Sequence, residues 1–135
     1  MAALMKRIHL IFGILLFVTF VITGRYMRLD FPDKDAISPD LRLLMRSRHI
    51  YILFSALIHL TLGIYLQIRA PLWQKAVQYA GSTVLFATSV LLIWAFISES
   101  YSTHTFSGLS LYGVIFSLVG VGLHVIGGLR AGTRL

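Results

Sequence analysis

The stretch from Arg46 to Arg69 reads RSRHIYILFSALIHLTLGIYLQIR. Between Ile50 and Arg69, only His59 and the closing Gln67 and Arg69 are strongly polar. Because about twenty apolar residues suffice to cross a bilayer as a helix, this stretch predicts one transmembrane helix. At about 1.5 Å of rise per residue, His59 would lie about 15 Å from the charged end. At that depth an ionisable side chain is expected to face protein rather than lipid.

The composition of the whole chain is that of an integral membrane protein. Of its 135 residues, 57% are hydrophobic and only 13% are charged, and the mean hydropathy is +0.81. Four apolar runs are long enough to span a bilayer, and we expect helices at about 8–24, 39–68, 78–98 and 108–129. The sequence therefore predicts an all-α, antiparallel four-helix bundle that fills one transmembrane domain, 1–135.

The second helix is expected to begin well before its apolar run. Ser38 is a favoured N-cap residue, Pro39 suits the first helical position, and Asp40 suits the positive end of the helix dipole. The short link after this helix contains Pro71 and Trp73, so the second and third helices should be antiparallel neighbours.

Basic residues lie mainly at the ends of the apolar runs and give a formal net charge of +7. We interpret them as anchors for lipid headgroups, so the expected partner is the lipid bilayer and not nucleic acid. Six Lys and Arg residues fall on the side of the termini and six on the other side, so the positive-inside rule does not decide the orientation. The loop from Glu99 to Ser107 contains no Lys or Arg. We therefore expect both termini on the cytoplasmic side of a bacterial inner membrane, with Glu99 outside the bilayer.

The chain has no cysteine. This excludes disulfides, thiolate metal sites, iron–sulfur clusters and covalent c-type haem attachment. A metal would have to be held by His, Met, carboxylate or Tyr side chains. No hydrolase, phosphate-loop or dinucleotide-binding motif is present, so the sequence leaves open whether the protein is an enzyme.

Histidines within the apolar runs are the candidate cofactor ligands. Each has small residues at helical spacing: Gly13 follows His9, Ser55 and Gly63 flank His59, and Gly120 and Gly128 flank His124. A b-type haem in a helical bundle needs inward imidazoles, small neighbours beside the macrocycle, and basic or hydroxyl groups for the propionates.

We therefore expect haem b, with His59 and His124 as the metal ligands and His9 as the alternative to His59. Arg69 and Arg130 would bind the propionates. The protein would then be a small membrane cytochrome with an electron-transfer or haem-handling role.

Other interpretations of the histidines stay open. Each could form a hydrogen bond to a neighbouring helix, for example to the hydroxyls of the third helix (Ser82, Thr83, Thr88 and Ser89), or act in a proton relay. The protein would then be a cofactor-free accessory or structural subunit of a membrane complex. His49 and His104 could instead form a copper or zinc site with Asp or Glu99. Glycine stripes on the first and last helices favour a homo-oligomer or a larger complex.

Two segments resemble known haem-associated families. The segment His124-Val-Ile-Gly-Gly-Leu-Arg130 resembles the H-x-x-x-G-x-R segment of the succinate dehydrogenase cytochrome b subunit. The layout of His9, Arg25, M-x-x-R-x-x-Y from Met45 to Tyr51, and Trp73 with Lys75 is similar to the HemJ type of protoporphyrinogen oxidase. Both resemblances imply association with haem. A separate family of small bacterial membrane proteins is the alternative.

Overall fold

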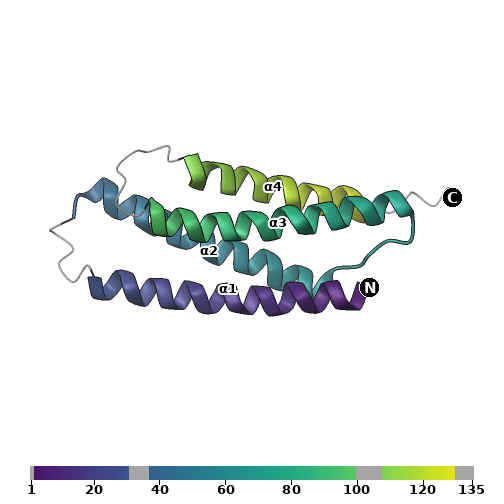
Figure 1. The fold of residues 1–135 in the computed structure, drawn as a ribbon, viewed down its shortest axis with the longest axis horizontal. Helices are drawn as coiled ribbons and strands as arrows, with labels where there is room; N and C mark the ends of the chain where they lie inside the picture. Colours follow the sequence, from purple (N-terminus) through teal and green to yellow (C-terminus); the bar gives the residue numbers. More distant parts are fainter. Residues whose placement is uncertain (1, 31–36, 100–107, 130–135) are drawn as a thin grey trace.

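The computed structural model describes residues 2–30, 37–99 and 108–129, and these residues form four helices (Figure 1). They are α1 (Ala2–Asp30), α2 (Pro39–Tyr65), α3 (Leu72–Ser98) and α4 (Gly108–Gly128). No strand occurs in this part of the chain. Each helix is long and apolar enough to cross a membrane. The predicted all-α membrane bundle is confirmed.

The helix bounds differ from the expected ones mainly in α1, which ends at Asp30 rather than near 24, and at the bundle end that holds the start of α1. There α1 begins at Ala2 rather than near 8, and α3 begins at Leu72 rather than near 78. Polar and aromatic residues flanking the apolar runs continue the helices, because backbone hydrogen bonding does not depend on hydropathy. The opposite holds for α2, which ends at Tyr65 rather than 68. Leu66 then has the extended backbone angles φ −56° and ψ 125°.

The expected start of α2 is confirmed. Ser38 is its N-cap, and the Ser38 hydroxyl accepts a hydrogen bond from the Leu41 amide at 3.4 Å. Pro39 occupies the first helical position and Asp40 lies in the first turn. Both features stabilise a helix start, because the first amides lack partners within the helix.

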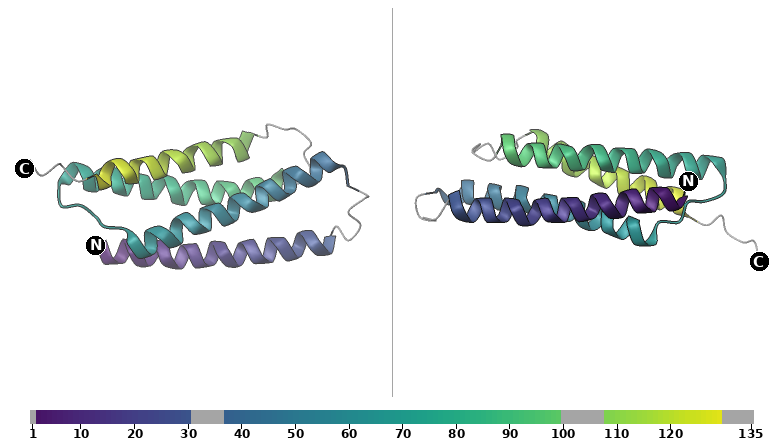
Figure 2. Two further views of the ribbon diagram at one scale, coloured as in Figure 1. Left: turned by 180° about the vertical axis from the view of Figure 1, so that it is seen from behind. Right: turned by 60° about the horizontal axis from the view of Figure 1, so that its bottom comes forward.

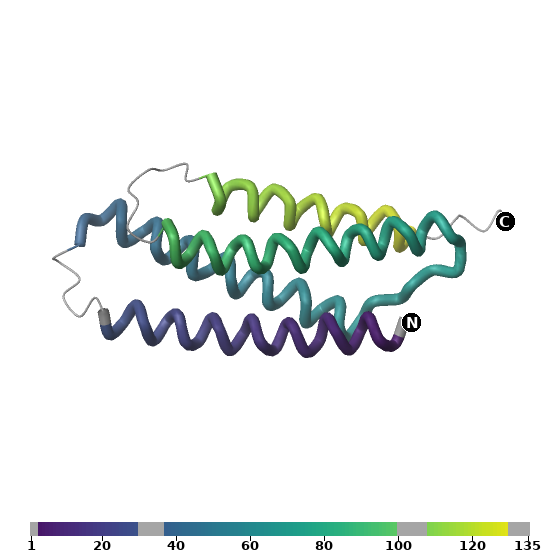
Figure 3. Tube along the Cα trace, in the orientation of Figure 1, coloured from purple at the N-terminus to yellow at the C-terminus, as the bar shows by residue number. Residues whose placement is uncertain are grey.

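The four helices pair as two antiparallel hairpins, α1 with α2 and α3 with α4 (Figures 2 and 3). The hairpins meet mainly through α2 and α3, whereas α2 and α4 touch only slightly. The beginning of α1 and the end of α4 lie at the same end of the bundle (Figure 1). Because α2 and α4 touch only slightly, a groove lies between them.

Glycines set the close approach within each hairpin. A Cβ atom on Gly63 of α2 would lie 2.7 Å from the Leu10 Cα of α1, and one on Gly120 of α4 would lie 2.7 Å from the Leu85 Cγ of α3. The small residues beside His59 and His124 thus make room for neighbouring helices. On α4 the packed face continues to Gly127 and not, as the sequence suggested, to Gly128. A Cβ on Gly128 would have nothing within 4 Å.

Candidate functional site

Two histidines form the centre of a buried polar cluster where the hairpins meet. His9 of α1 and His59 of α2 both have 0% exposed surface. Their Nδ1 atoms are 2.8 Å apart, which is a hydrogen bond between the two rings. The close crossing of α1 and α2 at Gly63 brings the two rings together.

Ser82 of α3 connects this pair to the third histidine. Its hydroxyl oxygen is 2.9 Å from the His9 Nε2 atom and 3.2 Å from the His124 Nε2 atom. The rings of His9 and His124 have centroids 6.1 Å apart and are nearly perpendicular, with an interplanar angle of 77°. One serine therefore joins α1 to α4 across α3.

Hydroxyl and carbonyl groups complete the other side of His59. Its Nε2 atom is 3.0 Å from the Ser89 hydroxyl and 3.4 Å from the Leu85 carbonyl oxygen of α3. The Ser89 hydroxyl also lies 2.5 Å from that of Ser55 and donates to the Leu85 carbonyl at 2.7 Å. A continuous hydrogen-bonded chain thus runs from Ser55 to His124, and we call it the His–Ser chain. Its members are Ser55, Ser89, His59, His9, Ser82 and His124.

Aromatic rings enclose the centre of the His–Ser chain. Phe86 stacks on His9 with centroids 4.7 Å apart, and Phe12 meets His59 edge-on at 4.9 Å. The sequence analysis did not single out these two phenylalanines. Their helical spacing from members of the His–Ser chain, Phe12 from His9 and Phe86 from Ser82, is the signal that could have found them.

His124 differs from the other two histidines. It is 9% exposed, and its Nδ1 atom is buried without a hydrogen-bond partner among the described residues. The Cδ2 side of the ring faces Gly81 of α3, where a Cβ would come within 3.0 Å of it. Another side of the ring lines a cavity on the side of α2, whereas the Nδ1 atom itself has less than 1 Å² of accessible surface.

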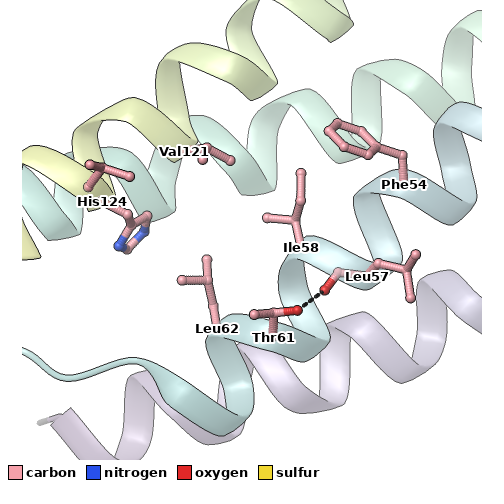
Figure 4. Close-up of a pocket in the computed structure, with 8 residues that line it drawn as sticks. Phe54, Leu57, Ile58, Thr61, Leu62, Val121 and His124 are labelled. Carbon is pink, nitrogen blue, oxygen red and sulfur yellow. Dashed lines mark hydrogen bonds between the residues drawn. The ribbon is translucent and has the colours of Figure 1, made fainter.

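A groove between α2 and α4 lies on that side of His124 (Figure 4). Its cavity has a volume of about 480 Å³ and is lined by Phe54, Leu57, Ile58, Thr61, Leu62, Val121, His124 and Val125. The Thr61 hydroxyl donates to the Leu57 carbonyl at 2.8 Å, so apart from His124 the walls are effectively apolar. The His124 ring points from α4 toward Leu62 on α2 (Figure 4).

The groove adjoins a polar cavity of about 250 Å³ toward the end of the bundle. The two cavities share Thr61, Leu62 and His124, and the second is also lined by Gln67, Arg69 and Gln78. Arg69 donates to the Gly128 carbonyl through Nε at 3.2 Å and Nη2 at 2.9 Å, which satisfies the end of α4. The apolar groove, which contains one imidazole, is therefore continuous with a polar cavity that contains the Arg69 guanidinium group. Arg130 lies outside the described residues.

The structure brings His9, His59 and His124 together more closely than their sequence depths suggested. Counting a continuous helix back from Arg69 places His59 about 6 Å deeper than His124. α2 ends six residues after His59, and α4 ends four residues after His124. The three rings come together because His9 lies between the other two, 2.8 Å from the His59 ring (Nδ1 to Nδ1) and 6.1 Å from the His124 ring (centroid to centroid). His9 contacts both of the other rings.

The alternative copper or zinc site has no support from the described residues. His49 stacks on Phe20 with centroids 4.2 Å apart, and its Nδ1 atom lies 3.1 Å from the Thr23 hydroxyl. His104 lies outside the described residues. Within the described part of the chain, no group of three or more His, Asp or Glu side chains is arranged to hold a metal ion.

Glu99 was expected outside the bilayer, but it is only 8% exposed. Its carboxylate accepts hydrogen bonds from the Ser110 hydroxyl at 2.6 Å and from the Leu109 amide at 3.0 Å, at the start of α4. Arg48, 2% exposed, has its Nε atom 3.7 Å from that carboxylate and also donates to the Glu99 carbonyl. A carboxylate at the positive end of a helix dipole, facing an arginine, can be buried within the protein. The position of Glu99 outside the bilayer stays a prediction.

The fold and site together define a four-helix membrane protein with a buried His–Ser chain that ends beside an apolar groove. No protein-family model, curated protein or solved structure matches this chain significantly. The two resemblances drawn from the sequence stay predictions.

Proposed function

We propose that this chain is a small haem b-binding protein of a bacterial inner membrane, with His124 as the axial ligand. The observation that carries the proposal is the state of the His124 ring. One nitrogen bonds to Ser82, and the other is buried without a partner beside a groove. Histidines that bind metals typically use one nitrogen as ligand and hold the ring through the other.

The groove supports this choice of ligand. Its volume of about 480 Å³ lies within the range of about 300–1,000 Å³ that small-molecule and cofactor sites occupy. Apolar walls suit a macrocycle, and Arg69 at the polar end suits its carboxylates, because guanidinium groups bind carboxylates well. A bound haem would supply a redox-active iron.

His9 and His59 fit the ligand role less well. Each has both ring nitrogens within hydrogen-bonding distance of a partner, and the shortest of these bonds joins the two rings. A cofactor held by one histidine in a groove between two helices would exchange more readily than one enclosed by the bundle. We therefore propose haem handling, meaning uptake and release, in preference to permanent electron transfer.

Titration of the purified protein with hemin tests the proposal. We expect a Soret band that saturates at one hemin per chain in the wild type and in His49→Ala, and no such band in His124→Ala. His49 is the matched control because it is a partly buried helical histidine outside the His–Ser chain. Far-UV circular dichroism checks that each variant is folded. A spectrum that survives His124→Ala would overturn the assignment of the ligand.

A cofactor-free accessory subunit is the second candidate. The observation in its favour is that His9 and His59 have 0% exposed surface and bond to each other across a helix interface, as polar groups that hold membrane helices together do. A colourless preparation that takes up no added hemin would favour this function over the first.

We also propose that the chain forms a homo-oligomer, with membership of a larger membrane complex as the alternative. In α1 only 17% of the most apolar window is buried within the chain, against 44% in α3. A Cβ on Gly128 of α4 would meet nothing within 4 Å, and exposed glycines permit close contact between membrane helices. Native mass spectrometry in detergent should show a dimer or higher species. Only monomers, without a co-purifying partner, would contradict this proposal.

A further inference from the structure

The donor and the acceptor of each hydrogen bond in the His–Ser chain can be assigned in turn, starting from Ser89. Ser89 has a single hydroxyl hydrogen, which it donates to the Leu85 carbonyl at 2.7 Å. Both groups near the His59 Nε2 atom, the Ser89 oxygen at 3.0 Å and the Leu85 carbonyl at 3.4 Å, are then acceptors. His59 Nε2 must therefore carry the proton and donate it.

The next two links follow from the neutral state of the rings. A charged imidazole buried away from any described carboxylate would be costly, so each ring carries one N–H. With Nε2 protonated, the His59 Nδ1 atom accepts the bond of 2.8 Å, and His9 Nδ1 donates it. His9 Nε2 is then an acceptor, and the Ser82 hydroxyl 2.9 Å away donates to it.

The last link fixes the state of His124. Ser82 has given its only hydrogen to His9, so its oxygen accepts from the His124 Nε2 atom at 3.2 Å. A neutral His124 that is protonated on Nε2 has an unprotonated Nδ1. That Nδ1 is the buried atom without a described partner, on a ring that lines the groove.

We propose that His59, His9 and Ser82 are positioning residues that hold His124 in its Nε2–H form and leave its Nδ1 atom unprotonated. Hydrogen-bonded chains of this kind polarise one another, so the Leu85 carbonyl influences a ring two histidines away. The consequence for ligand binding rests on the proposed haem function. The protonation pattern does not, because it belongs to the protein without a ligand.

Nuclear magnetic resonance of the histidine-labelled protein in detergent, without hemin, tests the pattern directly. Nitrogen chemical shifts distinguish protonated from unprotonated ring nitrogens. We expect Nε2–H at His59 and His124, and Nδ1–H at His9, each assigned by its replacement with Asn or Gln. The proposal is overturned if His9 carries its proton on Nε2, if His124 carries its proton on Nδ1, or if any of the three is an imidazolium.

Substitutions at Ser82 test the positioning role. Ser82→Ala removes the link between His9 and His124, whereas Ser82→Thr keeps a hydroxyl. We expect both protonation forms of His124 in Ser82→Ala and a single form in Ser82→Thr. Hemin affinity should fall about 10- to 100-fold in Ser82→Ala, the usual effect of losing the outer partner of a metal-binding histidine. An unchanged single form in Ser82→Ala would show that Ser82 does not position the ring.

The two experiments separate this inference from the proposed function. If the nitrogen shifts show the expected protonation pattern and the wild-type protein binds no hemin, the proposed function fails while the assigned pattern of the His–Ser chain holds. If hemin binds through His124 but the ring carries its proton on Nδ1 before binding, the function stands and the positioning role fails. Should the alanine variant not fold, the shifts of the wild type still decide the matter.

Discussion

Buried polar side chains form two separate groups along the length of this bundle. The His–Ser chain contains only neutral groups, each bonded to another member. Toward the opposite end of the bundle, Arg48 and Glu99 form a buried charged pair that also holds the start of α4 through Ser110. Ile52 and Leu92, which are 0% and 1% exposed, lie along α2 and α3 between the two groups. The two polar groups can therefore be tested independently.

Glu99→Gln should strongly destabilise the bundle. The substitution leaves the Arg48 charge without its carboxylate, and breaking a buried ion pair from one side typically costs about 3–5 kcal/mol. The measurement is thermal unfolding in detergent followed by circular dichroism. The double variant Arg48→Met with Glu99→Gln should recover part of the loss, because no uncompensated charge remains. Equal stability of Glu99→Gln and wild type would show that the pair contributes nothing.

Part of the site could be predicted from single residues. The position of His59 deep in an apolar run indicated that it faces protein, and the hydroxyls of the third helix were candidate partners of the histidines. Two of them, Ser82 and Ser89, bond across to histidines, whereas Thr83 bonds to its own helix. Spacing within one helix cannot show which hydroxyl faces which imidazole. That depends on how far each helix slides along its neighbour.

Helices as elements were predictable because hydropathy and length suffice to indicate a membrane span. Their ends were less so. The extended backbone begins at Leu66, although the first strong helix breaker in the sequence is Pro71. The Gln78 side chain holds this link in place: it accepts a hydrogen bond from the Arg69 amide at 3.0 Å and donates one to the Gln67 carbonyl at 3.0 Å. These bonds between distant residues stabilise the early end of α2.

Gly63→Ala should weaken the pairing of α1 with α2. Its Cβ would lie 2.7 Å from both the Cα and the N of Leu10, and backbone atoms cannot move aside cheaply. Overpacking of this kind typically costs about 1–3 kcal/mol. Because Leu10 follows His9, the bond between His9 and His59 should lengthen as well. Thermal unfolding gives the first effect, and the nitrogen shifts of the two rings give the second.

Gly122→Ala is the control for that substitution. Its Cβ would meet nothing within 4 Å, and alanine is favoured over glycine in a helix by up to about 1 kcal/mol. The variant should be as stable as wild type or slightly more stable. If both glycine variants behaved alike, the close crossing of α1 and α2 would not be the cause of any loss.

The whole molecule is two hairpins joined mainly through α2 and α3. Each connection between helices reverses the chain direction, so the start of α1, the α2–α3 link and the end of α4 share one end of the bundle (Figure 1). The groove beside His124 continues to Arg69 at this same end. A ligand with charged groups would therefore place them at the membrane surface on the side of the termini, which we propose is cytoplasmic.

Single-cysteine labelling in intact cells tests this arrangement, and the absence of native cysteine removes any background. Leu72, 82% exposed at the start of α3, and Asp40, exposed in the first turn of α2, lie at opposite ends of the bundle. A membrane-impermeant maleimide should label Asp40→Cys in intact cells and Leu72→Cys only after permeabilisation. The reversed pattern would contradict the proposed orientation while leaving the fold intact. Labelling of both positions from one side would contradict the membrane arrangement itself, because α2 would then not cross the bilayer.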